Sequence, residues 1–310
     1  MITVLFAAAD HAWPEYETVL PAALAEAGLD ATVIRETDRP KDVDYIVYAP
    51  NGSLTDFTPY TNLKAVLSLW AGVEKIVGNT TITCPLCRLV DPSLAQGMTE
   101  WVVGQVMRHH LGLDRYIKRD SRDWDQVTPP LASQRKVTIL GIGELGAASA
   151  RALRALGFDV HGWSNSQKAI DGVTCHAGAG GLEPALAGAE IVVLLLPDAP
   201  GTQSVINAGT LAHLAQEAVI INPGRGPLID DDALIDALNS GQLSHATLDV
   251  FRQEPLPQDH PFWSHAGITI TPHVASETRP FSAAKVIAEN MRRAEAGEAL
   301  MHVVDRDRGY

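Results

Sequence analysis

Residues 137–153 read VTILGIGELGAASARAL, and this stretch decides the fold. A short run rich in β-branched residues leads into three glycines and then into an alanine-rich segment, which predicts a strand, a tight turn and a helix in succession. The first glycine permits the turn, the second lets the backbone approach a pyrophosphate, and the third allows the helix to pack closely on the strand. The helix N-terminus offers free N–H groups to the phosphates. The stretch therefore predicts a dinucleotide-binding turn, with contacts at Gly141, Gly143, Glu144, Leu145 and Gly146.

Short β-branched runs alternate with longer Ala/Leu-rich runs on both sides of this stretch, which is typical of α/β domains built on mostly parallel sheets. Strands are expected in two series, at 2–6, 31–35, 45–49 and 65–69, and then at 136–140, 159–163, 173–176, 190–196, 218–222, 246–250 and 268–271. Helices are expected at 21–27, 98–118, 147–156, 231–240 and 281–296. The pattern predicts an α/β fold of two Rossmann-like domains, a doubly wound parallel-sheet domain and a smaller flavodoxin-like domain.

The helix expected at 98–118 would connect the two domains, and the polar stretch 119–135 would lead into the second sheet. The last helix has Pro280 at its start and Gly297 just past its end, as helices commonly do. We expect this helix to return to the first domain. The smaller domain is therefore predicted to be discontinuous, at residues 1–97 and 280–310, with the larger domain at 98–279.

The charge balance excludes several classes of partner. With 24 Lys plus Arg against 37 Asp plus Glu in 310 residues, the net charge of −13 repels nucleic acid and anionic membranes. The most apolar run, 191–197, is far shorter than the ~20 residues of a membrane span. The three cysteines cannot form a complete disulfide framework, and the N-terminus lacks the cationic part of a secretory signal. The cysteine pair at 84 and 87 has no second pair of cysteines or histidines with which to bind a metal ion. We expect a cytoplasmic protein without a metal site.

The loop after the strand at 159–163 bears on the choice of dinucleotide. An NAD site usually has an Asp or Glu there, which accepts a hydrogen bond from the ribose 2′-hydroxyl. The loop 164–168 reads SNSQK, so its hydroxyls, amides and Lys168 could bind a 2′-phosphate instead, which favours NADPH. Because the loop has no arginine for bidentate phosphate binding, use of NADH stays open. The cofactor contacts expected here and at later strand ends are Trp163, Ser164, Asn165, Ser166, Lys168, Leu196, Pro197 and Pro223.

Three side chains that could take part in catalysis follow the carboxyl ends of three successive predicted strands, where open α/β sheets bind ligands. Arg225 could hold a substrate carboxylate and polarise its carbonyl group. His273 could supply or remove the hydroxyl proton, and Glu254, if bonded to the imidazole, would orient it and favour its protonated form. Each residue alone has an ordinary structural explanation, but their joint placement predicts a catalytic set for hydride transfer.

These residues lie in segments that resemble the D-isomer-specific 2-hydroxyacid dehydrogenases, in the glyoxylate/hydroxypyruvate reductase A branch. The resemblance covers nearly the whole chain and rests on residues 141–146, 197–202, 222–226, 248–257, 261–263, 271–275 and 304–310. It implies that Arg225, Glu254 and His273 carry catalysis and that Asp249 helps to hold the nicotinamide carboxamide. It also implies that relatives are typically homodimers, and the 98–118 helix with the 119–135 extension would suit a two-fold partner.

The resemblance further implies a substrate loop at 69–74, whose backbone N–H groups would bind the 2-oxoacid carboxylate. The substrate contacts expected from it are Trp70, Ala71, Gly72, Val73 and Arg88, together with Arg225 and His273. Trp70 departs from the common pattern, which has a glycine there, and could instead pack in the core. Asn165 and Gln167 also depart, because related reductases often have basic residues at these positions.

The sequence thus predicts an NADPH-preferring oxidoreductase that reduces glyoxylate to glycolate and hydroxypyruvate to D-glycerate. Two alternatives stay open. One is a D-2-hydroxyacid dehydrogenase with a different substrate, and the other is a non-catalytic dinucleotide sensor. A sensor needs no acid and base, so the retention of all three catalytic candidates argues against it.

Overall fold

The computed structural model describes residues 1–117, 122 and 124–306, which form two compact units. The first unit comprises residues 1–94 and 278–310, and the second comprises residues 95–277. The division expected from the sequence was 1–97 with 280–310, and 98–279. The end of the helix expected at 118 and the last four residues of the C-terminal motif lie outside the described residues.

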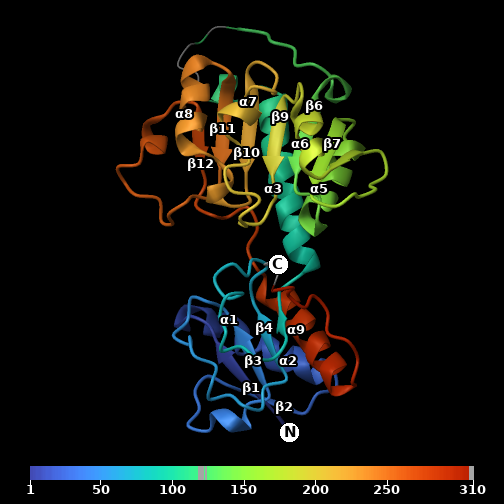
Figure 1. Ribbon diagram of the computed structural model, residues 1–310, viewed down its shortest axis with the longest axis vertical. Coiled ribbons are helices and arrows are strands. Elements are labelled where there is room, and N and C mark those ends of the chain that lie inside the picture. The colour runs from blue at the N-terminus through green and yellow to red at the C-terminus, as the bar shows by residue number, and fades with distance from the viewer. Residues whose placement is uncertain (118–121, 123, 307–310) are drawn as a thin grey trace. The chain divides into compact units, whose positions relative to one another are not determined.

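The first unit is a five-stranded parallel sheet with the strand order β2-β1-β3-β4-β5, which is the flavodoxin-like order (Figure 1). Its elements are β1 (Ile2–Ala7), α1 (Trp13–Tyr16), α2 (Val19–Glu26), β2 (Ala31–Ile34), β3 (Tyr45–Tyr48), β4 (Ala65–Ser68), β5 (Leu86–Cys87) and α9 (Pro280–Glu295). One face of the sheet packs on α1, α2 and α9, and the other face packs on loop residues between β3 and β5. The return of α9 makes this unit discontinuous in sequence.

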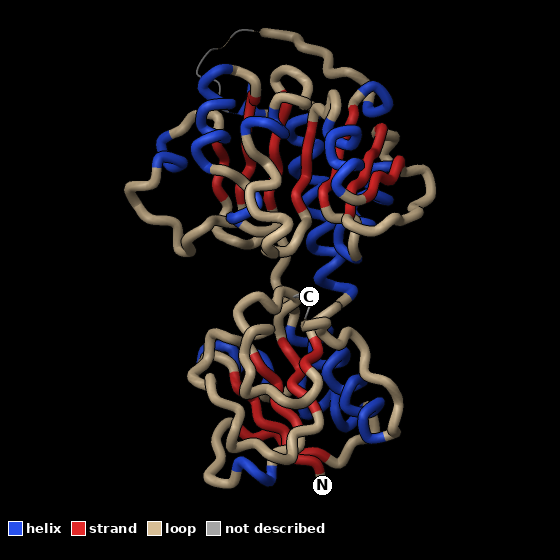
Figure 2. Tube along the Cα trace, in the orientation of Figure 1, coloured by secondary structure: helices blue, strands red, loops and turns tan. Residues whose placement is uncertain are grey.

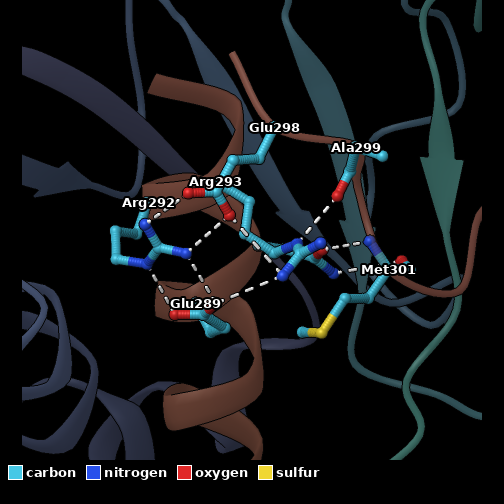
Figure 3. Close-up of polar contacts among 7 residues, drawn as sticks. Glu289, Arg292, Arg293, Glu298, Ala299 and Met301 are labelled. Carbon is cyan, nitrogen blue, oxygen red and sulfur yellow. Dashed lines mark hydrogen bonds and ion pairs between the residues drawn. The ribbon is translucent and has the colours of Figure 1, made fainter. Parts of the chain in front are cut away.

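Ion pairs and backbone bonds attach the segment after α9 to the helix (Figure 3). Nε of Arg292 lies 2.8 Å from Glu289 Oε2, and the same guanidinium reaches Glu298 at 2.8 Å. Nε of Arg293 donates to the Ala299 carbonyl oxygen at 2.7 Å. The chain then continues beside β5, where Val304 N donates to Leu86 O and covers that edge of the sheet.

The second unit is a seven-stranded parallel sheet with the order β12-β11-β10-β9-β6-β7-β8, which extends the Rossmann order by one strand. Its strands are β6 (Lys136–Leu140), β7 (Asp159–Ser164), β8 (Thr174–Ala177), β9 (Ile191–Leu194), β10 (Ala218–Asn222), β11 (Leu243–Leu248) and β12 (Ile268–Ile270). Its helices are α3 (Pro92–His110, which starts in the first unit), α4 (Asp114–Ile117), α5 (Glu144–Ala155), α6 (Ala179–Leu186), α7 (Ala208–Leu211) and α8 (Asp231–Ser240). Helices α3 and α5 cover one face, and α6, α7 and α8 cover the other (Figure 2). The α/β class and the two parallel sheets are as predicted.

The connecting helix differs from its prediction at both ends. Helix α3 begins at Pro92, where Asp91 Oδ1 accepts the Ser93 N–H and Pro92 occupies the first turn. It ends at His110, because Gly112 adopts a left-handed φ of 62°, and the short α4 follows. The prediction relied on apolar periodicity, which is clear only from residue 98 onward, so it placed the start of the helix too late. The same periodicity continues past Gly112, where the helix has already ended.

Candidate functional site

The turn between β6 and α5 is shaped by its three glycines, each for a different steric reason. A Cβ at Gly141, whose φ is 101°, would lie 2.4 Å from the Leu195 carbonyl oxygen. A Cβ at Gly146 would lie 1.9 Å from the Gly141 carbonyl oxygen, so the helix could not approach the turn. Gly143, in contrast, has no described atom within 4 Å of its Cβ position. This open space in front of the α5 N-terminus fits the close approach of a dinucleotide pyrophosphate.

The loop after β7 lies next to this turn, because β6 and β7 are paired and Gly141 N donates to Trp163 O at 2.8 Å. The Ser164 hydroxyl donates to Ser166 O at 2.7 Å, and Lys168 is exposed. The Trp163 indole is buried and donates to Gly178 O at 2.8 Å. The loop therefore offers polar groups and one cation to a ligand, while the Trp163 ring belongs to the core.

His273 and Glu254 form a hydrogen-bonded pair. Nδ1 of His273 lies 2.8 Å from Glu254 Oε2, and Oε1 of the same carboxylate accepts the Phe251 N–H at 2.9 Å. The two side chains are 50% and 37% exposed. Nδ1 is engaged, and Nε2 of His273 has no partner within the described part of the chain. The carboxylate orients the ring, so that the other nitrogen can exchange a proton with a ligand.

Asp249 holds the loop that carries His273. Its side chain is fully buried, and its two oxygens accept the Val274 and Ala275 N–H groups at 2.9 Å each, together with the Thr271 hydroxyl. Its carbonyl oxygen accepts the His273 N–H at 2.8 Å. His273 adopts a left-handed φ of 56°, which is costly for a residue with a Cβ and needs such support.

Arg225 follows the end of β10. The loop is held by the buried Asn222, whose Nδ2 donates to Arg225 O at 2.9 Å and whose Oδ1 accepts the Gly224 N–H. Nη1 of Arg225 donates to Gly224 O at 2.7 Å. Asn222 O in turn accepts the Asp249 N–H at 3.0 Å, which ties this loop to the neighbouring one.

The residues predicted for the cofactor and for catalysis thus gather within the second unit, at the carboxyl ends of its parallel strands. Leu196 and Pro223 are buried there, and Pro197 O accepts the Thr202 hydroxyl at 2.6 Å. We did not predict from the sequence that Asn222 supports the Arg225 loop. The sequence places Asn222 directly before Pro223 and Gly224, but it does not indicate the hydrogen bonds that its side chain makes across the loop.

The predicted substrate loop lies in the first unit, directly after β4. The Trp70 side chain is half-buried against the core, as the structural alternative proposed, and the Lys75 ammonium lies 6.0 Å from its ring centroid. No acceptor is found within the described residues for the N–H groups of Ala71, Gly72 and Val73. Arg88 follows β5, and its N–H donates to His302 O at 3.0 Å. Free amides in a turn of small residues can bind an anion.

The remaining chemical candidates have structural explanations. The three cysteines are free, and burial raises the pKa of the Cys87 thiol to about 11. Within residues 1–117, 122 and 124–306, no group of three or more His, Cys, Asp or Glu is arranged to hold a metal ion. No described helix is long and apolar enough to cross a membrane.

Comparison with known proteins identifies the family. The family model "D-isomer specific 2-hydroxyacid dehydrogenase, NAD binding domain" matches residues 101–275. The chain is 40% identical over 281 residues to glyoxylate/hydroxypyruvate reductase A of Serratia proteamaculans, covering 88% of this chain and 89% of that protein. It is 36% identical over 310 residues to the protein of that name from Klebsiella pneumoniae subsp. pneumoniae, covering 96% and 98%.

Two solved structures extend the likeness to the whole chain. One is a D-isomer specific 2-hydroxyacid dehydrogenase from Xanthobacter autotrophicus Py2 in complex with NADPH and MES, with a TM-score of 0.92, 40% identity and 99% coverage of both chains. The other is an NADPH-dependent glyoxylate/hydroxypyruvate reductase from Sinorhizobium meliloti in complex with NADP and sulfate, with a TM-score of 0.88, 33% identity and 100% coverage of both. The chain therefore belongs to the D-isomer specific 2-hydroxyacid dehydrogenase family, in its glyoxylate/hydroxypyruvate reductase A branch.

Proposed function

We propose that this protein is an NADPH-preferring reductase of small 2-oxoacids, which converts glyoxylate to glycolate and hydroxypyruvate to D-glycerate. The observation that carries the proposal is the 2.8 Å bond between His273 and Glu254, in the same unit as a glycine turn with open space at Gly143. The names of the similar reductases support this choice of substrates. Because the turn, the helix terminus and the catalytic pair belong to one parallel sheet, a bound dinucleotide and a proton donor would meet at one sheet edge.

In this proposal NADPH, when bound, supplies the hydride for C2 of the oxoacid. His273 donates its Nε2 proton to the oxygen of the oxo group, so that the carbonyl becomes a hydroxyl. Glu254 holds Nδ1 and stabilises the positive charge that the ring carries before the transfer. Arg225 pairs with the substrate carboxylate and stabilises the charge that develops on the oxo oxygen.

Both ligands are anions, and the chain has a net charge of −13. The proposed sites therefore depend on local positive groups. These are Arg225, Arg88, the α5 N-terminus and the amides of the 71–73 loop. Lys168 adds a cation for a 2′-phosphate, in a loop that has no carboxylate to bind a ribose 2′-hydroxyl. This composition supports NADPH, and without an arginine it leaves NADH as a weaker cofactor.

We also propose that the protein is a cytoplasmic homodimer. Large apolar side chains are exposed on the segment after α3, among them Ile117 at 70%, Trp124 at 88% and Leu131 at 71%, and a second copy would bury them. Three free thiols suit a reducing compartment. Light scattering during size exclusion tests the dimer, and Trp124→Ser should shift the population towards monomer. A wild-type protein that is monomeric at micromolar concentration would contradict the dimer.

The function is tested by steady-state oxidation of NADPH and NADH with glyoxylate, hydroxypyruvate and a panel of larger 2-oxoacids. We expect turnover with both small acids and a higher kcat/KM with NADPH than with NADH. Higher kcat/KM with a larger 2-oxoacid would instead favour a dehydrogenase of different specificity. NADPH binding without turnover of any acid would favour the non-catalytic sensor.

A further inference from the structure

A hydroxyl on the segment that returns to the first unit bonds to the beginning of the predicted substrate loop. Oγ1 of Thr278 donates to the Leu69 carbonyl oxygen at 2.9 Å. Thr278 is the first residue of the returning part of the unit, and Leu69 is the first residue after β4. Thr278 belongs neither to the predicted catalytic residues nor to the predicted binding residues.

Two further carbonyl groups of the same loop accept hydrogen bonds from the protein. The Trp70 carbonyl oxygen accepts the Leu89 N–H at 3.0 Å and the Ser68 hydroxyl at 3.0 Å. The Val73 carbonyl oxygen accepts the Ile76 N–H at 2.9 Å. The two successive bound carbonyls, those of Leu69 and Trp70, determine the orientation of the two peptide planes that lead into residue 71.

The N–H groups of the loop contrast with its carbonyls. Those of Ala71, Gly72 and Val73 have no acceptor anywhere in the described ranges, although the Val73 side chain is buried. Buried or half-buried amides are normally paired, so three consecutive unpaired ones indicate a place for an anionic ligand. The bound Trp70 carbonyl fixes the peptide that carries the first of these N–H groups, that of Ala71.

We infer that Thr278 is a positioning residue for the oxoacid carboxylate, because its hydroxyl fixes the peptide that precedes the anion-binding amides. This inference rests on the proposed function, in which the 71–73 amides bind the substrate. Without this bond, the Leu69–Trp70 peptide would be held only through the Trp70 N–H, which donates to the Ser68 hydroxyl at 3.0 Å. The amides that follow would then be less well ordered when the carboxylate arrives. The cofactor-binding groups lie in the other unit and would not change.

The isosteric pair Thr278→Val and Thr278→Ser separates the hydrogen bond from the packing of the side chain. We expect Thr278→Val to raise KM for glyoxylate and hydroxypyruvate roughly 3- to 10-fold, the range of one lost hydrogen bond, with an unchanged KM for NADPH. Thr278→Ser keeps the hydroxyl and should restore KM. Ser282→Ala is the matched control, because the Ser282 hydroxyl lies on the same segment but donates to Asp91, and its loss should leave KM for the oxoacid unchanged.

Hydrogen exchange of the free protein gives a second readout that does not require turnover. The peptide covering residues 69–76 should exchange faster in Thr278→Val than in wild type, Thr278→Ser or Ser282→Ala. Wild-type exchange and wild-type KM in Thr278→Val would overturn the inference, and so would equal damage by Thr278→Ser. If the wild type turns over no 2-oxoacid, the proposed function fails, while the exchange comparison still decides whether Thr278 orders the loop.

Discussion

At the scale of single residues, the pairing of His273 with Glu254 depends on a backbone that neither residue could hold alone. His273 has a left-handed φ, and its loop is supported by three hydrogen bonds to the buried Asp249 carboxylate. The resemblance assigned Asp249 to the nicotinamide carboxamide, and that role stays a prediction. The contacts that the structure describes for this carboxylate hold the loop of the proposed proton donor.

Replacing His273 by Ala should lower kcat about 10²- to 10⁴-fold, the usual range for loss of a general acid. The Kd for NADPH should stay close to that of the wild type, because the glycine turn is untouched. Glu254→Gln keeps the ring contact but removes the negative charge, so it should cost less. His265→Ala is the control, since this histidine bonds to Asn239 away from the pair. Wild-type kcat in His273→Ala would rule out the proposed role.

At the scale of elements, the β6–α5 turn shows two uses of glycine in one motif. The structure explains Gly141 and Gly146 by contacts within the protein, whereas Gly143 has open space. All three fit one sequence pattern, so the pattern alone could not tell which glycine serves the fold and which serves the ligand.

Gly143→Ala and Gly146→Ala should therefore have opposite effects. Gly143 has a φ of −73°, outside the left-handed region, and no described atom within 4 Å of its Cβ position, so this variant should keep most of the wild-type Tm without ligand but bind NADPH more weakly. In Gly146→Ala the new Cβ would meet the Gly141 carbonyl oxygen, and overpacking of this kind costs about 1–3 kcal/mol or more. Thermal unfolding and a fluorescence titration with NADPH measure both effects. A lower Tm for Gly143→Ala, with unchanged affinity, would show that its role is structural.

At the scale of the whole molecule, one buried and two half-buried histidines link stability to pH. Burial lowers the pKa of His110, His161 and His176 below the ordinary 6.5, and the nearby cations Arg135 and Lys136 add to the effect. The unfolded chain therefore binds more protons than the folded chain as the pH falls through the ordinary histidine range. The neutral histidines therefore contribute to the free energy of unfolding. This contribution is fully present above about pH 6.5 and is lost as the pH falls towards the histidine pKa values of the folded protein.

The Tm should consequently fall as the pH is lowered from about 6.5 to about 5.5, before most carboxylates begin to titrate. The Nδ1 atom of His110 is buried and has no described partner, so His110→Leu removes a titrating group without breaking a described bond at that atom. The variant should lose less Tm over this pH range than the wild type. An unchanged pH dependence would contradict the assignment to His110.

We could predict the α/β class, the glycine turn and the residues proposed for catalysis from the amino-acid sequence. These depend on local patterns, namely hydrophobic periodicity and turn chemistry, which are visible along the chain. Three features were not predicted, because hydrophobic periodicity is weak over so few residues. They are the two-residue β5, the break at Gly112 and the start of α3 at Pro92. The roles of the proposed site residues stay predictions.

The residues that support the proposed site could be recognised only in the folded protein. The bonds of Asp249 to Val274 and to the Asn222 carbonyl oxygen, and of Thr278 to Leu69, exist because strand order and the return of α9 bring separate loops together. A hydroxyl or carboxylate in the sequence carries no sign of a partner that lies 209 residues away, as Leu69 lies from Thr278. Such a hydrogen bond depends on positions in space, which are determined within each unit by the packing of its sheet and helices.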